Sequence, residues 1–153
     1  MNEILSQLTV IRNNQLGLIS KYKLSELNQI PKGFNNNLVW NFGHSIVTQH
    51  LLTYGLCNLD LPIDNQLVTS FRKGTTPQEN YAIETVEALK VVALDSVKNL
   101  AKNISANRFS NFESYQTSFG LKLENFEQAL LFNYIHEGLH FGYMLALKNC
   151  IDG

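Results

Sequence analysis

Four long stretches of the sequence place apolar residues at helical spacing, and almost nowhere do apolar and polar residues alternate as in a half-buried strand. The stretches run from about Glu3 to Tyr22, from Asn35–Asn37 to Cys57 or Asn58, from about Ala82 to Asn103, and from Asn125 to about Asn149. A helix with one apolar face must cover that face against another element. Four such helices in one small chain therefore predict an all-α fold, and specifically a four-helix bundle.

The connections between these stretches carry weaker signals. A turn of helix is expected after Ser25, before Pro31–Gly33 ends it, and another over Asn65–Phe71. Proline is favoured at the first helical position, so Thr76–Pro77 marks a potential helix start. The connection from Ile104 to Glu124 is too rich in aromatic and aliphatic residues to be a disordered linker, and we expect it to pack on the bundle.

Length and charge restrict the class of protein. A chain of 153 residues is expected to form one domain, residues 1–153. A net charge of -1 with scattered basic residues offers no patch for nucleic acid or an anionic membrane. No apolar run approaches the ~20 residues that a membrane span needs. The N-terminal sequence does not have the pattern of a signal peptide, so we expect a cytoplasmic protein.

A reducing cytoplasm favours free thiols at the two cysteines, Cys57 and Cys150. They lie near the ends of the second and last helical stretches. If those helices run parallel at matching height, both thiols lie at the same end of the bundle, too far from the middle of either helix to ligate a metal there.

The four histidines suggest a metal site. His136 and His140 are four residues apart, so on a helix they lie one turn apart on the same face. His44, on the second helix, supplies a third imidazole, whereas His50 is six residues further on and points elsewhere. Three histidines can hold one divalent metal and leave a coordination position open. The alternative is a set of partly buried core histidines bonded to backbone or hydroxyl groups.

The segment HEGLH also matches the H-E-x-x-H pattern, in which the glutamate is the general base of a metalloprotease. That interpretation is disfavoured because no third histidine follows His140 and no strand is predicted to align a peptide. Glu137 and Tyr143 remain candidate catalytic residues that could assist proton transfer near the metal. The alternative for Glu137 is a solvated carboxylate on the helix surface.

Several polar side chains share the helical faces of the histidines. Asn41, Thr48 and Asn133 are candidates to line a substrate pocket, although all three are ordinary helix-face residues. Imidazole ligands suit several divalent metals, of which Zn, Ni, Fe and Mn are the candidates.

Three segments together resemble one known family. They are NNLVWNFGHSIVTQHLLTYGL, with Trp40 four residues before His44, FRKGTTP at Phe71–Pro77, and NFEQALLFNYIHEGLHFGYMLALK. SYQTSFGLKL, before the last helix, fits one subgroup of the same family. In this order they are similar to the DinB-like (YfiT-like) superfamily of metal-dependent enzymes. The resemblance implies an up-up-down-down four-helix bundle, often a homodimer, with a metal held by His44, His136 and His140.

The resemblance leaves the reaction open. Some members are thiol S-transferases that use low-molecular-weight thiols, which makes thiol transfer to a small-molecule electrophile the leading hypothesis. A hydrolase that uses metal-bound water is the first alternative. A metal- or small-molecule-binding module without turnover is the second.

Overall fold

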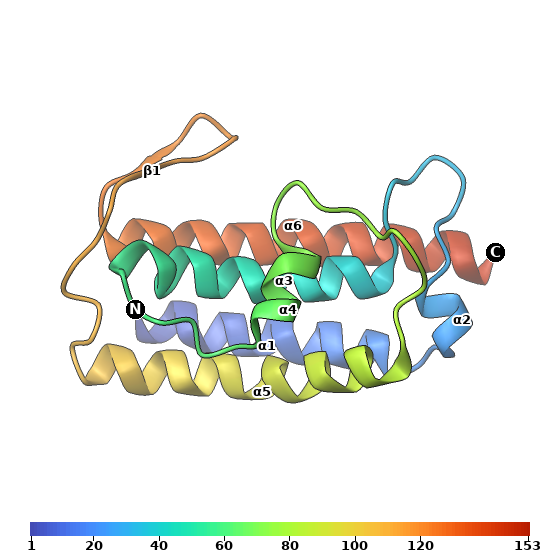
Figure 1. Cartoon of the computed structure of the whole chain (residues 1–153), viewed down its shortest axis with the longest axis horizontal. Coiled ribbons are helices and arrows are strands. Elements are labelled where there is room, and N and C mark those ends of the chain that lie inside the picture. The colour runs from blue at the N-terminus through green and yellow to red at the C-terminus, as the bar shows by residue number, and fades with distance from the viewer.

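The computed structural model describes all residues from 1 to 153 and is mostly helical. Figure 1 shows the four long helices lying side by side. They are α1 (Asn2–Ile19), α3 (Leu38–Thr53), α5 (Ile83–Ser105) and α6 (Phe126–Asp152). The shorter elements are α2 (Leu24–Leu27), the 3-10 turn η1 (Gly55–Cys57), α4 (Asn65–Phe71), β1 (Tyr115–Gln116) and β2 (Lys122–Leu123). None of the helices is both long and apolar enough to cross a membrane.

The long helices run in two directions, α1 and α6 one way and α3 and α5 the other (Figure 1). Side-chain packing agrees with this. Leu52, near the end of α3, packs with Ala129, near the start of α6, so these two helices are antiparallel. The amide of Asn103 donates to the hydroxyl of Tyr54 at 2.7 Å, which joins the C-terminal ends of α3 and α5 and makes them parallel.

The expected up-up-down-down order is therefore wrong, and the helices follow an up-down-down-up order instead. The physical reason lies in the connections. Only the segment 58–82, which carries α4, travels the length of the helices before the next one starts, whereas the other two long connections turn back at one end (Figure 1). Parallel neighbours need such a crossover, and the sequence pattern does not reveal which connection makes it.

The antiparallel packing of α3 and α6 also corrects the expected placement of the cysteines. Cys57 packs against Phe126, at the start of α6, while Cys150 is exposed near the end of that helix. The two thiols are thus at opposite ends of the molecule. Both are free, as expected for this chain.

Helix starts follow the capping residues. Asn37 caps α3 by accepting a hydrogen bond from the backbone N–H of Trp40 at 2.8 Å, in one of the places the sequence indicates. No helix, however, starts at Thr76–Pro77, whereas the third long helix begins at Ile83, one residue from its expected start at Ala82. The backbone before it is held extended, because Asn28 exchanges two side-chain hydrogen bonds with the backbone N–H and C=O of Tyr81.

The connection between α5 and α6 forms a small antiparallel hairpin, in which Tyr115 pairs with Leu123. Its strands are two residues each, too short to leave a period in the sequence. The expectation that this connection packs on the helices holds for Phe109 and Phe112. Phe119, near the hairpin tip, is instead 61% exposed, and its ring forms a T-shaped pair with Phe132 of α6, with ring centroids 5.7 Å apart.

Candidate metal centre and its cavity

Three histidines meet where α3 and α6 pass each other. His44 comes from the middle of α3, and His136 and His140 come from successive turns of α6. Their ring centroids are 4.4–5.1 Å apart, and one nitrogen of each lies within 4.8 Å of the other two. Such a separation lets one ion contact all three nitrogens at normal ligand distances. The three residues identified from their spacing are therefore close enough to hold a metal ion.

Two of the imidazoles are oriented by hydrogen bonds from their Nδ1 atoms. His44 Nδ1 lies 2.7 Å from the carbonyl oxygen of Phe71, which can only accept, so this nitrogen carries the proton. His140 Nδ1 lies 2.9 Å from the side-chain oxygen of Asn41. Outer partners of this kind fix the tautomer of a ligating histidine and leave Nε2 with its lone pair.

The oxygen of Asn41 is itself held in place. Its amide nitrogen donates to the side chain of Asn36 at 2.7 Å and to the carbonyl of Asn37 at 2.8 Å. With both amide protons used, the oxygen is the atom that faces His140. Asn41 is therefore a positioning residue for His140 and is not part of the cavity surface.

His136 differs from the other two because its Nδ1 is buried and has no hydrogen-bond partner. Burial, helped by the neighbouring His140 and His44, lowers the pKa of His136 to about 3. Burial and the nearby His44 lower the pKa of His140 to about 4, and burial also lowers the pKa of His44. All three rings are neutral at pH 7, which is the form that binds metal. Three neutral rings, each with one nitrogen within 4.8 Å of the other two, fit the donor set of a divalent cation.

Trp40 and Phe71 both contact His44 of α3. The indole of Trp40 stacks on His44 with ring centroids 4.5 Å apart and an angle of 9° between the planes, and its N–H donates to Thr75 at 3.0 Å. Phe71 lies against Gly43, where an added Cβ would stand 2.5 Å from the phenyl ring. The absence of a side chain at Gly43 thus allows Phe71 to approach α3 and bring its carbonyl to His44.

We expect Gly43→Ala to damage both the fold and the metal centre. The new methyl group must displace Phe71, and overpacking of this kind costs about 1–3 kcal/mol of unfolding free energy. The displaced carbonyl also releases His44, for which a loss of about 10–100-fold in metal affinity is typical. Urea unfolding and metal titration measure the two effects.

Gly17→Ala is the matched control, because an added Cβ on this α1 glycine meets no atom within 4 Å. It should leave metal affinity unchanged and raise stability by up to ~1 kcal/mol, since alanine is the better helix former. Normal metal affinity in Gly43→Ala would contradict the role given to Phe71.

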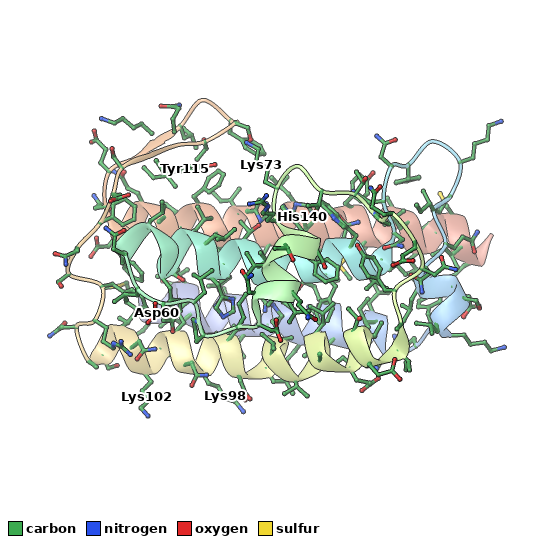
Figure 2. All side chains as sticks on the ribbon, in the orientation of Figure 1. Asp60, Lys73, Lys98, Lys102, Tyr115 and His140 are labelled. Carbon is green, nitrogen blue, oxygen red and sulfur yellow. The ribbon has the colours of Figure 1, made fainter.

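A cavity of about 760 Å³ opens beside the three histidines. Its walls come from α3, α6, the hairpin and the loop after α4, and Figure 2 shows Lys73, Tyr115 and His140 on this same side of the molecule. It is lined by His44, Thr48, Leu51, Leu52, Gly55, Leu56, Lys73, Tyr115, Thr117, Ser118, Phe119, Phe132, His136, Leu139, His140 and Tyr143. The histidines thus face a space large enough for a small organic molecule.

Comparison with known protein families identifies the superfamily of this chain. Its sequence matches the family model of the DinB superfamily over residues 7–144, which include all three histidines. The chain belongs to the DinB superfamily. DinB proteins are typically metal-binding, in agreement with the histidine cluster. A search of curated proteins found no match.

The remaining candidate residues of this DinB protein fall into two groups. Thr48 and Tyr143 line the cavity, and the hydroxyl of Thr48 lies 3.4 Å from His44 Nε2. Asn133 and Glu137 are fully buried and do not line it. The amide of Asn133 donates to Glu137 at 3.3 Å. Glu137 is thus neither a solvated carboxylate nor a group that faces the metal centre.

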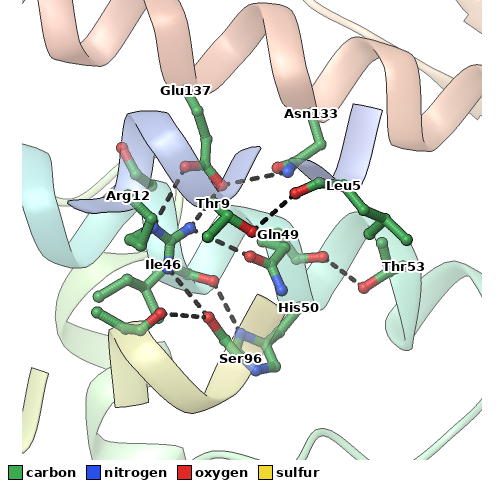
Figure 3. Close-up of polar contacts among 12 residues, drawn as sticks. Leu5, Thr9, Arg12, Ile46, Gln49, His50, Thr53, Ser96, Asn133 and Glu137 are labelled. Atoms are coloured by element: carbon green, nitrogen blue, oxygen red, sulfur yellow. Dashed lines mark hydrogen bonds and ion pairs between the residues drawn. The ribbon is translucent and has the colours of Figure 1, made fainter. Parts of the chain in front are cut away.

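The partner of Glu137 is Arg12 of α1, which is also buried (Figure 3). The guanidinium donates Nε and Nη2 to the two carboxylate oxygens, the Nε bond being 3.3 Å long. It also donates to Ser96 and to Gln49, each at 3.1 Å. This buried polar cluster joins all four long helices.

Sequence reasoning missed this cluster, although a signal exists. Arg12 and Gln15 continue the spacing of Leu5 and Leu8 toward Ile19, so they occupy the apolar face of α1. A charged residue at such a position requires a partner of opposite charge from another helix. Glu137 is an acidic residue on another helix that can be this partner if its side chain points into the bundle.

Proposed function

We propose that this protein is a metal-dependent enzyme that transfers the sulfur of a low-molecular-weight thiol to an electrophilic small molecule. The observation that carries the proposal is that three neutral histidines, and no fourth protein ligand, border a cavity of about 760 Å³. A structural metal site is closed by protein ligands, whereas a catalytic one keeps a position for an exogenous molecule. When bound, a divalent metal at such a site lowers the pKa of a thiol or water that reaches it.

The composition of the cavity supports a thiol over water as the nucleophile. A general base that takes a proton from water would favour hydrolysis, and none of the lining residues is aspartate or glutamate. Glu137, which with Tyr143 was a candidate to assist proton transfer, accepts hydrogen bonds from Arg12 instead. A thiol is the more acidic nucleophile and attacks as the thiolate, so the site has only one proton to move.

Two hydroxyl groups have roles in this proposal. Thr48 lies beside His44 and can donate a hydrogen bond to sulfur that approaches the three histidines. Tyr143 borders both the cavity and solvent, with 36% of its surface exposed, and relays the thiol proton outward. The sulfur lone pair then forms the S–C bond, and the bond from that carbon to its leaving group breaks with the electron pair on the leaving group.

The test is conjugation of monochlorobimane by glutathione, cysteine or bacillithiol, with protein loaded in turn with Zn, Ni, Fe or Mn. We expect at least one thiol and metal pair to react faster than the uncatalysed rate, with saturation in thiol, loss on chelation and recovery on adding the metal back. Chloride leaves and one proton is released per turnover. His50→Ala should retain activity, because this fourth histidine lies outside the cavity.

Other outcomes identify the alternatives. Metal-dependent ester or amide turnover without any thiol would indicate a hydrolase. Metal binding with neither reaction would indicate a binding module, and the transferase proposal would then be wrong.

A further inference from the structure

Lys73 is the only lysine among the residues that line the cavity, and no arginine, aspartate or glutamate lines it. It is exposed and takes part in none of the four ion pairs of the chain, nor in any side-chain hydrogen bond. The other lining residues are apolar or hydroxyl-bearing residues, the glycine Gly55, and the three histidines of the candidate metal centre. Because no acidic side chain lines the cavity or pairs with Lys73, its ammonium group is free to bind an anionic part of a ligand.

The loop that presents Lys73 is tied to the metal centre. Gly74, the next residue, has φ = 89°, a conformation that favours glycine. Thr75 then donates to the carbonyls of Ser70 and Arg72 at 3.0 and 2.8 Å and accepts the indole N–H of Trp40. Since Trp40 stacks on His44, the position of this loop relative to the histidines is set by direct contacts.

The cavity between Lys73 and the histidines is mainly apolar. Its walls include Leu51 and Leu56 near the end of α3, Phe132 and Leu139 on α6, and Phe119 from the hairpin. Such walls favour contact with the carbon skeleton of a ligand and disfavour a second charged group, because burying an unpaired charge is costly. A ligand that matches every part of the cavity therefore has one anionic end, an apolar body and a metal-binding end.

We propose that Lys73 is a specificity-determining residue that binds the carboxylate of an amphipathic thiol whose sulfur reaches the three histidines. The inference rests on the proposed function for the identity of the sulfur end, whereas the ion pair at Lys73 stands on the cavity alone. The ammonium group and the carboxylate attract each other, and the apolar body fixes the distance between the two ends. An uncharged thiol of the same length lacks the first of these interactions.

The test compares 6-mercaptohexanoate with 6-mercaptohexan-1-ol, which differ only in the terminal group, by calorimetric titration of zinc-loaded protein. We expect the acid to bind about fivefold more tightly than the alcohol, the upper range for a partly exposed ion pair. Lys73→Met should abolish this preference by weakening only the acid, and Lys73→Arg should retain it. Added salt should reduce the preference in the wild type.

Lys98→Met is the matched control. Lys98 is also exposed, but Figure 2 places it on α5, on the far side of the molecule from His140. Its replacement removes the same charge from the protein and should leave the preference for the acid intact. An equal loss in Lys98→Met and Lys73→Met would mean that net charge, and not Lys73, selects the acid, and the proposal would fail.

A second ligand pair separates this proposal from the proposed reaction. Hexanoate and hexan-1-ol cannot supply sulfur, so their binding reports only on the cavity and Lys73. Preference for hexanoate that depends on Lys73, without binding of either thiol, would support the anion site and count against the transferase. Equal affinity of the wild type for acid and alcohol in both pairs, or a preference that survives in Lys73→Met, would overturn the inference.

Discussion

The His136→Ala variant is expected to lose its metal. The wild type should hold close to one divalent ion per chain, because three neutral imidazoles converge within 4.8 Å of one another. Removing one of only three protein ligands should weaken binding by more than the roughly 10–100-fold that follows loss of an outer hydrogen-bond partner. Elemental analysis of untagged protein and metal titration measure the effect, without the carry-over that a polyhistidine tag introduces.

The chain offers two informative comparisons. His50→Ala removes a histidine of similar burial that lies outside the cluster, where its Nδ1 donates to the carbonyl of Ile46, so full metal content is expected. Asn41→Ala removes the outer partner of His140 and should give an intermediate affinity. Metal should also raise the unfolding free energy of the wild type by about 2.7 kcal/mol at 100 times Kd, and this gain should vanish in His136→Ala. No binding by the wild type with Zn, Ni, Fe or Mn would refute the metal centre.

The features that the sequence predicts well are local. Helical periodicity requires no knowledge of partners, so the four long helices appear within a few residues of their expected ends. The spacing of His136 and His140 guarantees a shared face on any helix. His44 was the harder inference, because only the packing of α3 against α6 brings it to the other two.

Helix direction was not predictable in the same way. Apolar spacing says which face of a helix is buried but not in which direction the helix runs, and bundles contain both parallel and antiparallel neighbours. The direction here follows from the crossover at 58–82, which lies against α3 where Phe71 meets Gly43. The family resemblance implied a different order, and the placement of Cys57 and Cys150 was wrong for the same reason.

The fate of Glu137 shows a second limit. Its position beside His136 suggested a group that faces the metal centre. The angular positions of residues on one helix could not show which residue of another helix its side chain would contact. The deciding residue, Arg12, is 125 positions away in the chain. A prediction of side-chain role therefore needed both helices, whereas the prediction of the histidine pair needed one.

We expect Glu137→Ala to lower the unfolding free energy by about 3–5 kcal/mol, which is the typical cost of leaving a buried charge without its partner. Arg12 is 1% exposed and Glu137 is not exposed at all, so water cannot replace the lost carboxylate. A domain of this kind has only about 5–15 kcal/mol of stability in total. Urea unfolding followed by circular dichroism should show a large fall in the midpoint concentration.

Two further variants distinguish the cost of leaving Arg12 buried without a partner from the general effect of replacing a glutamate. Glu87→Ala breaks the exposed pair with Lys90 on α5 and should change stability by less than about 1 kcal/mol. The double variant Arg12→Met/Glu137→Leu removes both buried charges and should be more stable than Glu137→Ala, because a hydrophobic replacement of a whole pair is often neutral or better. Recovery should be incomplete, since Gln49, Ser96 and Asn133 lose a partner.

The same variants test whether the pair serves the fold or the chemistry. Glu137 lies next to His136 but bonds only inside the buried polar cluster, so the folded double variant should keep its metal and its reaction rate. A double variant that is stable and binds metal but has lost turnover would mean that Glu137 takes part in the reaction. A movement of α6 would then have to expose its carboxylate to the cavity. Retained turnover would mean that the H-E-x-x-H pattern of this chain supplies two ligands and a structural carboxylate, with no general base.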